Sequence, residues 1–485
     1  MKIAQPYRPE PAYTALGDDN GAPFYDPVAP ASFPKTILRY RNQRWADAVG
    51  LAGLGDDDWI AHFARFEPLP DNIPAPVAIR YHGHQFRSYN PDIGDGRGFL
   101  FAQLRDGDDR LLDLATKGSG RTPYSRFGDG RLTLKGGVRE ILATEMLEAL
   151  GVYTSKSFSL VETGEALERN DEPSPTRSSV LVRLGHSHVR FGVFQRLAAE
   201  QDRDGLAALV DYCIRHFDAD LAAVPQGEQA ARFFARVSRR SAQLAAQWMA
   251  AGFVHGVLNT DNMNVTGESF DYGPWRFLPV MDPGFTAAYF DQTGLYAYGR
   301  QPEAVLWNLS RLGGALLPLT DEDALNDVLQ GYPRIFENAM AAAFFARLGI
   351  ARSDDAGADF KLVADLMRWM QETGVACERV FFDWFGAAAS SARRENSPLA
   401  APYRDAPFAD IAARLTAQTP DRPERLEAEY FQQEKPCTML IDEVESLWAA
   451  IADDDDWAPL TQKLTDIETM RKAFGFSQEF AASGA

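Results

Sequence analysis

The residues of this sequence that are best suited to chemistry lie between positions 255 and 273, in the stretch HGVLNTDNMNVTGESFDYG. Asp261 and Asn262 stand side by side, and Asp271 follows in a Phe-Asp-Tyr-Gly turn. Carboxylate and amide oxygens on two adjacent loops are hard ligands, suited to a Mg²⁺ ion that also touches phosphate oxygens. The sequence therefore predicts that Asn262 and Asp271 hold a divalent metal, with Asp261 beside them.

The spacing in this stretch is that of a protein-kinase catalytic loop. The residues HGVLNTDN have the length of the kinase loop His-Arg-Asp-Leu-x-x-x-Asn, and the triplet that begins at Asp271 fits the Asp-Phe-Gly that follows it. Val257, however, stands where a kinase has its catalytic Asp, and valine cannot accept a proton. Either the chain is catalytically inactive or Asp261 replaces the missing base. Taken alone, the motif is more often an ordinary turn, because Asn and Asp favour turns for backbone reasons.

A glycine-rich stretch, IGDGRGF at residues 93–99, precedes a predicted strand. Gly94, Gly96 and Gly98 alternate, which lets backbone N–H groups approach a phosphate closely, and Arg97 adds positive charge. A tight hairpin turn explains the glycines about as well. Because they precede a strand and do not open a helix, they do not form a Rossmann fingerprint.

Lys117 ends the predicted strand LLDLATK, and Glu140 lies in the first half of a predicted helix over residues 134–151. A strand lysine that contacts the α- and β-phosphates and is paired with a helix glutamate is the kinase arrangement. Arg139 and Glu145 are competing charges on the same helix, so the choice of Glu140 rests on helical register. Without the other motifs, the two would be a solvated lysine and an ordinary surface glutamate.

A basic cluster is needed if an acidic protein is to bind a nucleotide. The candidates are arginines that flank a predicted hairpin turn, RLGHSHVR, or lie in the loop after Lys117: Arg183, Arg190, Arg121, Arg126 and Arg131. Arginine forks suit phosphate better than lysine point charges. Asp129 and Gly130 mark a turn in the same loop, where Asp129 can also accept from the nucleotide or orient an arginine.

The histidines and cysteines do not predict a metal centre of their own. Two His-x-His pairs can each share one face of a strand, but no carboxylate or cysteine is spaced to complete a site, so we interpret them as structural: His82 with His84, and His186 with His188. The three cysteines are far apart and include no Cys-x-x-Cys, which excludes a zinc knuckle and a disulfide framework.

The composition restricts the partners. The chain has 485 residues, 45% hydrophobic and 24% charged, which is typical of a soluble globular protein of roughly two or three domains. A formal net charge of −19 repels phosphate backbones and anionic lipid surfaces, so we expect neither nucleic acid nor membrane as a partner. The N-terminal stretch has no export or transit pattern, and we predict a cytoplasmic protein.

The elements that must position these residues form a predicted α+β, protein-kinase-like, two-lobed fold. We expect an N-terminal arm with short helices over residues 1–75, and a β-rich N-lobe with one inserted helix over 76–200. A helical C-lobe with the metal and catalytic loop should cover 201–320, and a helical C-terminal extension 321–485. The strands of the N-lobe are predicted at residues 99–104, 111–117, 157–163, 178–184 and 189–195. The run Asp453–Asp456 is interpreted as solvated.

Three long motifs go beyond a kinase outline: YHGHQFRSYNPDIGDGRGFLFAQL, LDLATKGSGRTPYSRFGDGRLTLKGGVREIL, and FVHGVLNTDNMNV followed by FDYGP. Together they resemble the selenoprotein O (YdiU) family, from about residue 40 to the end. Members of that family resemble pseudokinases but transfer AMP from ATP to protein hydroxyl groups with Mg²⁺ or Mn²⁺. The resemblance implies that ATP lies inverted relative to a kinase, exposing the α-phosphate.

Carried over by position, the resemblance assigns a role to each candidate. Its nucleotide contacts fall on Gly94, Gly96, Arg97, Lys117, Asp129, Gly130, Arg183 and Arg190. Its ion pair falls on Lys117 and Glu140, its base on Asp261, and its metal ligands on Asn262 and Asp271. Many members carry a cysteine or selenocysteine near the C-terminus, whereas this chain ends EFAASGA, so a redox switch there is not expected.

We therefore predict a protein adenylyltransferase that moves AMP from ATP to Ser, Thr or Tyr hydroxyls of target proteins and releases pyrophosphate. ATP and Mg²⁺ or Mn²⁺ are the expected cofactors, target proteins the expected partners, and self-modification an expected side reaction. UMP transfer from UTP is left open. The alternatives are a catalytically inactive nucleotide-binding scaffold and a conventional kinase; the retained metal ligands argue against the first, and Val257 argues against the second.

Overall fold

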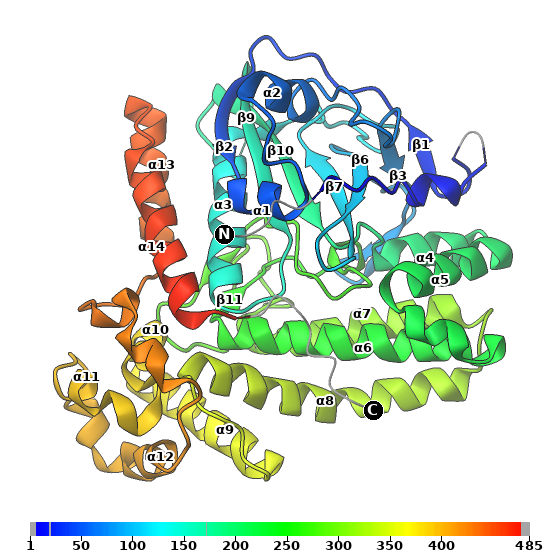
Figure 1. Ribbon diagram of the computed structural model, residues 1–485. Helices are drawn as coiled ribbons and strands as arrows, with labels where there is room; N and C mark the ends of the chain where they lie inside the picture. The colour runs from blue at the N-terminus through cyan, green and yellow to red at the C-terminus, as the bar shows by residue number, and fades with distance from the viewer. Residues whose placement is uncertain (1–5, 19–20, 171, 477–485) are drawn as a thin grey trace.

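An antiparallel sheet forms the centre of the upper lobe in this computed structural model, which describes residues 6–18, 21–170 and 172–476 (Figure 1). The strand order is β1-β3-β6-β7-β10-β9-β2, with β8 paired to β10. In chain order these strands are β1 (Tyr25–Pro27), β2 (Ile37–Arg41), β3 (Val77–Ile79), β6 (Leu100–Arg105), β7 (Leu111–Lys117), β8 (Leu132–Thr133), β9 (Lys156–Leu167) and β10 (Thr176–Gly185). A separate hairpin consists of β4 (Gly83–Gln85) and β5 (Ser88–Asn90).

One face of the sheet is covered by the inserted helix α3 (Leu134–Ala149), which begins at Thr133, whose side chain accepts from the N–H of Gly136. A Cβ at Gly137 would lie 2.4 Å from Leu160 on β9, so glycine is what lets the helix approach the sheet closely. The other face is covered by α1 (Gln43–Ala48) and α2 (Asp56–Phe63). There Trp59 and Phe63 pack on Phe158 of β9.

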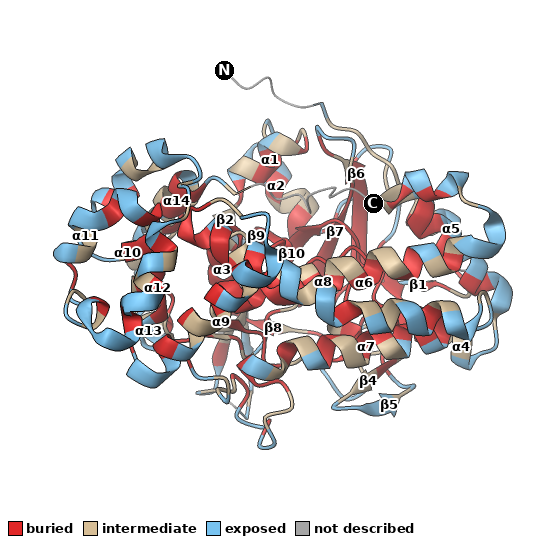
Figure 2. Ribbon diagram, turned by 90° about the horizontal axis from the view of Figure 1, so that it is seen from below, coloured by how far each residue is buried: buried red, intermediate tan, exposed pale blue. Residues whose placement is uncertain are grey.

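The lower lobe is helical (Figure 1). It contains α4 (Phe191–Ala199), α5 (Arg203–Phe217), α6 (Gln226–Ala250), α7 (Gln301–Leu316) and α8 (Glu322–Leu348). The loop predicted to carry the chemistry lies between α6 and α7, with the short elements β11 (Phe253–Val254), η3 (Thr260–Asn262) and β12 (Arg276–Phe277). Figure 2 shows that each long helix of this lobe turns its buried residues inward and its exposed residues outward.

The remaining helices continue the all-α character. They are α9 (Ala356–Thr373), α10 (Cys377–Trp384), α11 (Ser391–Glu395), α12 (Ala406–Thr416), α13 (Ile441–Asp454) and α14 (Ala458–Phe474). The last two form a hairpin that returns to the upper lobe and lies beside α3 (Figure 1). Asp455, in the turn of this hairpin, is exposed but binds Arg177 at 2.7 Å and Arg39 at 3.2 Å, so the acidic run is not merely solvated.

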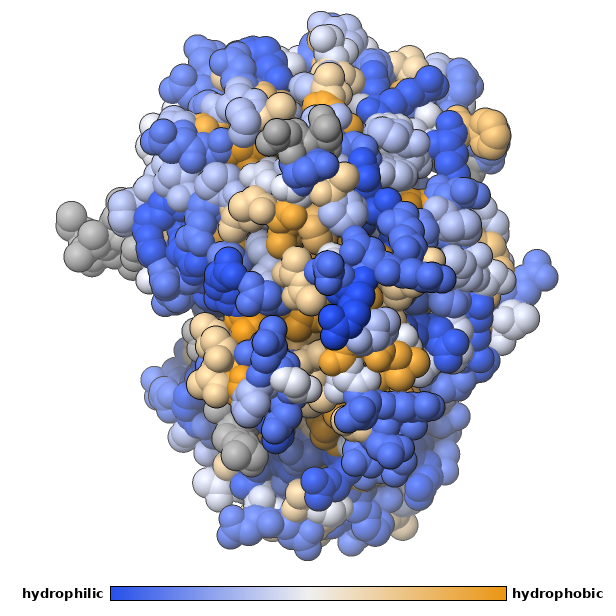
Figure 3. Space-filling view, turned by 90° about the vertical axis from the view of Figure 1, so that its right-hand side faces the viewer, coloured by the Kyte–Doolittle hydropathy of each residue, from blue (hydrophilic) through white to orange (hydrophobic). Residues whose placement is uncertain are grey.

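This is the predicted α+β, kinase-like architecture, with a β-rich lobe that carries one inserted helix and a helical lobe beneath it. The proposed limits at residues 75, 200 and 320 remain a prediction. The expectation about the last residues, EFAASGA, lies outside the described residues. Within the described part, every helix is too short or too polar to span a lipid bilayer. Figure 3 shows a largely hydrophilic surface on one side, with the hydrophobic side chains gathered mainly at mid-height.

Two local predictions were wrong. Residues 189–195, predicted as a strand, belong largely to helix α4, in which Phe191, Phe194 and Leu197 are buried at helical spacing. Phe194 stacks on Phe233 of α6, and a short apolar run of this kind does not separate helix from strand by itself. The predicted hairpin turn RLGHSHVR is also absent, because β10 ends at Gly185 and Arg190 is the N-cap residue of α4.

Candidate functional site

A pocket of about 700 Å³ lies between the upper lobe and the loop after α6. Its lining includes ten of the twelve candidate residues: Gly94, Gly96, Arg97, Lys117, Asp129, Gly130, Arg183, Arg190, Asp261 and Asp271. Glu140 contacts the pocket through Lys117, and Asn262 lies next to Asp261 without lining the pocket itself. The fold thus brings together residues that are up to 177 positions apart, which is the span from Gly94 to Asp271.

Asp271 is an anion surrounded by cations. Its carboxylate lies 2.7 Å from Lys117 Nζ, 3.2 Å from Arg183 and 3.9 Å from Arg190. Its φ of 64° is left-handed, a conformation that Asp tolerates better than most residues. Lys117 and the two arginines hold the pKa of Asp271 well below its usual range despite burial. Asp271 is therefore ionised at neutral pH.

Lys117 is fixed from two sides. Its Nζ lies 2.5 Å from Glu140 on α3 and 2.7 Å from Asp271, while the side chains of Lys117 and Glu140 are 5% and 0% exposed. The lysine reaches this position because it ends β7, a strand that is buried along its whole length. Glu140 Oε2 has no hydrogen-bond partner within the described part of the chain, so this carboxylate serves Lys117 alone.

Arg183 and Arg190 come from different elements, the strand β10 and the N-terminus of α4. Arg190 donates to the Asp261 carbonyl oxygen at 2.9 Å and to Asp95 at 3.4 Å. Its guanidinium also lies over the rings of Tyr81 and Phe270, at 4.8 and 4.9 Å. A buried arginine held by two oxygens and two rings is presented to the pocket in one orientation.

Asp261 and Asn262 lie in the single 3-10 turn η3. Burial raises the pKa of Asp261 to about 6, with Arg190 opposing the shift. The side-chain oxygen Oδ1 of each residue is buried and has no hydrogen-bond partner among the described residues. Asn262 instead donates its amide to the Val257 carbonyl at 3.0 Å, which leaves the amide oxygen free to accept or coordinate. These unpaired oxygens fit the predicted chemistry of a base and a metal ligand.

Hydrogen bonds from other elements hold this loop in place. The N–H of His84 on β4 donates to the Thr260 hydroxyl at 2.7 Å, and Tyr296 donates to Asn259 at 2.8 Å. His255, at the position of the kinase-loop histidine, is buried and donates from Nε2 to the Phe270 carbonyl at 3.1 Å. His255 therefore links the start of the loop to the turn that carries Asp271.

The residues present fit a divalent metal with few protein ligands. Asn262 and Asp271 are hard oxygen donors, and the amide oxygen of Asn262 is buried and unpaired in the described structure. No cluster of three His, Cys, Asp or Glu side chains suited to a metal occurs among the described residues. Mg²⁺ commonly uses one or two protein ligands and completes its shell with substrate phosphates and water.

The glycine-rich stretch is explained first by packing. A Cβ at Gly94 would lie 2.4 Å from the ring of Tyr124, and one at Gly98 would lie 2.0 Å from the Thr116 carbonyl oxygen. Gly94 thus lets the loop over residues 118–131 pack closely on the glycine-rich stretch, and Gly98 lets the end of β7 do so. Arg97 is exposed at the mouth of the pocket. Whether backbone N–H groups here contact phosphate stays a prediction.

The basic loop is organised differently from the prediction. Asp129 orients an arginine, but that arginine is Arg169, at 2.9 Å, which sequence reasoning missed because it lies between β9 and β10. Arg131 is paired with Glu165 at 2.9 Å. Arg126 lines the pocket, whereas Arg121 does not.

Two other pocket residues were also missed. Asp95 lies between two of the glycines, accepts from the N–H of Ile79 and binds Arg190, and Tyr124 donates to Asp26. Neither has a sequence pattern that marks it. Asp95 looks like part of a Gly-Asp-Gly turn, and only the approach of α4 brings Arg190 to it.

The histidine pairs have ordinary partners in the fold. His82 Nδ1 lies 2.7 Å from the Tyr89 hydroxyl, and His84 Nδ1 lies 2.9 Å from the Gln195 amide. His186 Nδ1 lies 2.8 Å from Glu268. His188 Nδ1 is 3.5 Å from Asp113, which accepts from the His188 backbone.

Fold and pocket together define a kinase-like protein that has Val257 where a conventional kinase has its catalytic Asp. A profile of the family described as "Protein adenylyltransferase SelO" matches residues 8–468. A protein named "Protein nucleotidyltransferase YdiU" from Synechocystis sp. is 43% identical over 473 residues, covering 94% of this chain and 97% of that protein. One of the same name from Gloeobacter violaceus is 45% identical over 462 residues, covering 93% and 92%.

The chain belongs to the SelO family, and it is an enzyme of the nucleotidyltransferase class. The resemblance drawn from the three long motifs is thereby confirmed. Membership of an enzyme family argues against an inactive scaffold.

Proposed function

We propose that this enzyme transfers AMP from ATP to a Ser, Thr or Tyr hydroxyl of target proteins. The hydroxyl oxygen forms a bond to the α-phosphorus, the bond from that phosphorus to the bridging oxygen of the β-phosphate breaks, and pyrophosphate leaves. The hydroxyl proton passes to a carboxylate of the enzyme. The observation that carries the proposal is the position of Asp261, which lines the same pocket as the cation cluster while Val257 occupies the place of a kinase base.

Asp261 is the group we assign as the base. It is buried at 8% exposure, its Oδ1 has no hydrogen-bond partner within the described structure, and its backbone carbonyl is held by Arg190. A base must lie within hydrogen-bond reach of the proton that it takes. A base displaced from the kinase position favours a displaced nucleotide, with the α-phosphate nearest to Asp261.

The cations are assigned to the phosphates. Lys117, Arg183 and Arg190 converge on Asp271, so all three point to one small region of the pocket. Preorganised charges of this kind stabilise the negative charge that develops on a leaving pyrophosphate. Asn262 and Asp271 would hold Mg²⁺ or Mn²⁺, and the metal would supply further charge neutralisation on the phosphate oxygens.

The test supplies ATP labelled with ³²P at the α- or the γ-position, with Mg²⁺ or Mn²⁺, to the full chain and a mixture of candidate target proteins. We expect α-label on protein, including some on the enzyme itself, and label-free protein with γ-labelled ATP. Asp261→Asn is the matched control, because it keeps the size of the side chain and removes its basicity.

Protein-bound γ-label would make this a phosphoryl-transferring kinase and contradict the proposal. α-Label that persists at the native rate in Asp261→Asn would keep the reaction and remove Asp261 as its base. A loss of α-label transfer when unlabelled UTP is added would show that UTP binds in the same pocket as ATP.

A further inference from the structure

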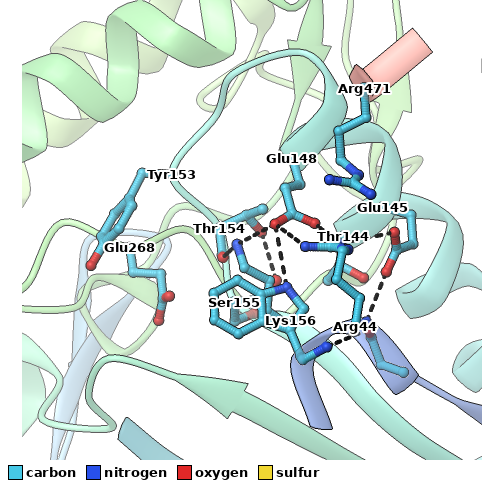
Figure 4. Close-up of polar contacts among 12 residues, drawn as sticks. Arg44, Thr144, Glu145, Glu148, Tyr153, Thr154, Ser155, Lys156, Glu268 and Arg471 are labelled. Atoms are coloured by element: carbon cyan, nitrogen blue, oxygen red, sulfur yellow. Dashed lines mark hydrogen bonds and ion pairs between the residues drawn. The ribbon is translucent and has the colours of Figure 1, made fainter. Parts of the chain in front are cut away.

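A second buried lysine, Lys156, lies outside the lining of the pocket that holds Lys117. Lys156 is the first residue of β9, and its side chain is 2% exposed. Its ammonium donates to the Thr154 carbonyl, lies 3.6 Å from Glu148 of α3, and sits 5.2 Å from the ring of Trp45. Figure 4 shows Glu148, Lys156 and Thr154 lying together beside α3.

The segment that Lys156 holds is the support of the Asp271 turn. Residues Thr154 and Ser269 form a parallel bridge, in which Ser155 donates to the Ser269 carbonyl at 2.9 Å. The Thr154 hydroxyl is also hydrogen-bonded to the Tyr272 hydroxyl. Ser269 and Tyr272 flank Asp271 in the sequence, so Thr154 contacts the turn both before and after that residue.

Glu148 is fixed independently of Lys156. It forms a two-pronged ion pair with Arg44 of α1, whose Nη1 lies 2.9 Å away, and it accepts from the Trp45 indole at 3.3 Å. Arg471 of α14 points toward Glu148 and Glu145 (Figure 4). Lys156 is thus tied to a rigid carboxylate that belongs to the same helix as Glu140.

From this geometry we infer that Lys156 is a positioning residue for the metal-binding turn, linking Glu148 on α3 to the Thr154 segment that holds Asp271. The inference rests on the proposed function, since it takes Asp271 as a metal ligand. Helix α3 then acts on Asp271 twice, through Glu140 and Lys117, whose ammonium contacts the Asp271 carboxylate, and through Glu148 and Lys156, whose ammonium contacts Thr154.

Burial opposes the charge on Lys156 and lowers its pKa, although Glu148 favours the charged form. For stability alone, an apolar side chain of similar length is often as good as a buried ion pair or better. A charged lysine at this place is therefore explained better by the geometry it imposes on Thr154 than by the stability it contributes.

The test compares Lys156→Met with Lys463→Met in the full chain. Both substitutions remove an ammonium from an ion pair, but Lys463 pairs with Glu443 in the C-terminal hairpin at 3.1 Å and has no contact with the pocket. The measurements are thermal unfolding, ATP binding as a function of Mg²⁺ or Mn²⁺ concentration, and amide hydrogen exchange over residues 268–273 without metal.

We expect Lys156→Met to raise the metal concentration for half-maximal ATP binding by about 10- to 100-fold, as is typical when a residue that orients a ligand is lost. Exchange over residues 268–273 should become faster, and ATP binding without metal should stay near native. Lys463→Met should change neither quantity. Native metal dependence in folded Lys156→Met would overturn the inference, as would equal shifts in both variants.

If Lys156→Met does not fold, Thr154→Val takes its place, because it keeps the side-chain shape and removes the hydroxyl that meets Tyr272. A shift in metal dependence in the same direction supports the inference, and a native profile overturns it. The native protein could bind ATP in a metal-dependent manner and yet transfer no label. That result would contradict the proposed function, but the comparison of ATP binding between the variants would still decide the inference about Lys156. Native protein whose ATP binding ignores metal would overturn the inference itself.

Discussion

Removing the Asp271 carboxylate should have separate effects on the stability of the fold and on catalysis. In Asp271→Ala, Lys117, Arg183 and Arg190 lose the anion on which they converge, at 2.7, 3.2 and 3.9 Å. Removing one partner of a fully buried ion pair costs about 3–5 kcal/mol, and less where water has access. With the Asp271 side chain 23% exposed, we expect a loss of about 2 kcal/mol in the free energy of unfolding.

The effect of Asp271→Ala on catalysis should be larger than its effect on stability. Loss of one preorganised electrostatic group in a site typically costs about 3–4 kcal/mol, or roughly 100- to 1,000-fold in kcat. ATP binding without metal should not weaken and should strengthen, because the phosphates can replace the missing carboxylate beside the three cations. Metal should then add little to the binding.

The assays are α-label transfer, thermal unfolding with and without ATP, and ATP binding with and without Mg²⁺. Asp271→Asn is the matched control, since it keeps one coordinating oxygen and loses the charge; its kcat should lie between the native and the alanine values. Near-native transfer in Asp271→Ala would remove Asp271 from the site. Equal losses of transfer and of metal-free ATP binding would mean that the residue acts only by holding the pocket together.

Three further variants test the other assignments. Lys117→Ala should reduce kcat/KM for ATP more than Glu140→Ala, because without Glu140 the lysine is still held by Asp271 at 2.7 Å; the reverse order in steady-state kinetics would refute the assigned pairing. Asp261→Asn should lower kcat by about 100-fold or more while leaving KM for ATP near native, as expected for loss of a general base; a change confined to KM would assign Asp261 to binding. Asp129→Asn should release Arg169, now held at 2.9 Å, and raise KM for ATP several-fold at unchanged kcat. An unchanged KM in that variant would show that Arg169 does not contact the nucleotide.

The parts of the site that follow from local spacing could be predicted from the sequence. The loop from His255 to Asp271 carries the candidate metal ligands Asn262 and Asp271 at kinase-like positions, and Lys117 ends a strongly apolar strand. The helix over residues 134–149 follows from its periodicity, and the kinase-like arrangement of a strand lysine and a helix glutamate predicted the ion pair of Lys117 with Glu140. The family resemblance rested on the same short-range patterns, and the comparisons confirmed it.

What depended on the approach of distant segments could not be predicted in this way. Arg190 was expected in a hairpin, yet it reaches Asp95 and Asp261 because the segment after it is a helix packed on α6. Arg169 meets Asp129 across 40 residues of sequence. Lys156 showed no pattern at all, because its role comes from three separate elements that meet around one ammonium group. A buried charge is placed by whichever partners the packing brings to it, and a linear spacing does not record those partners.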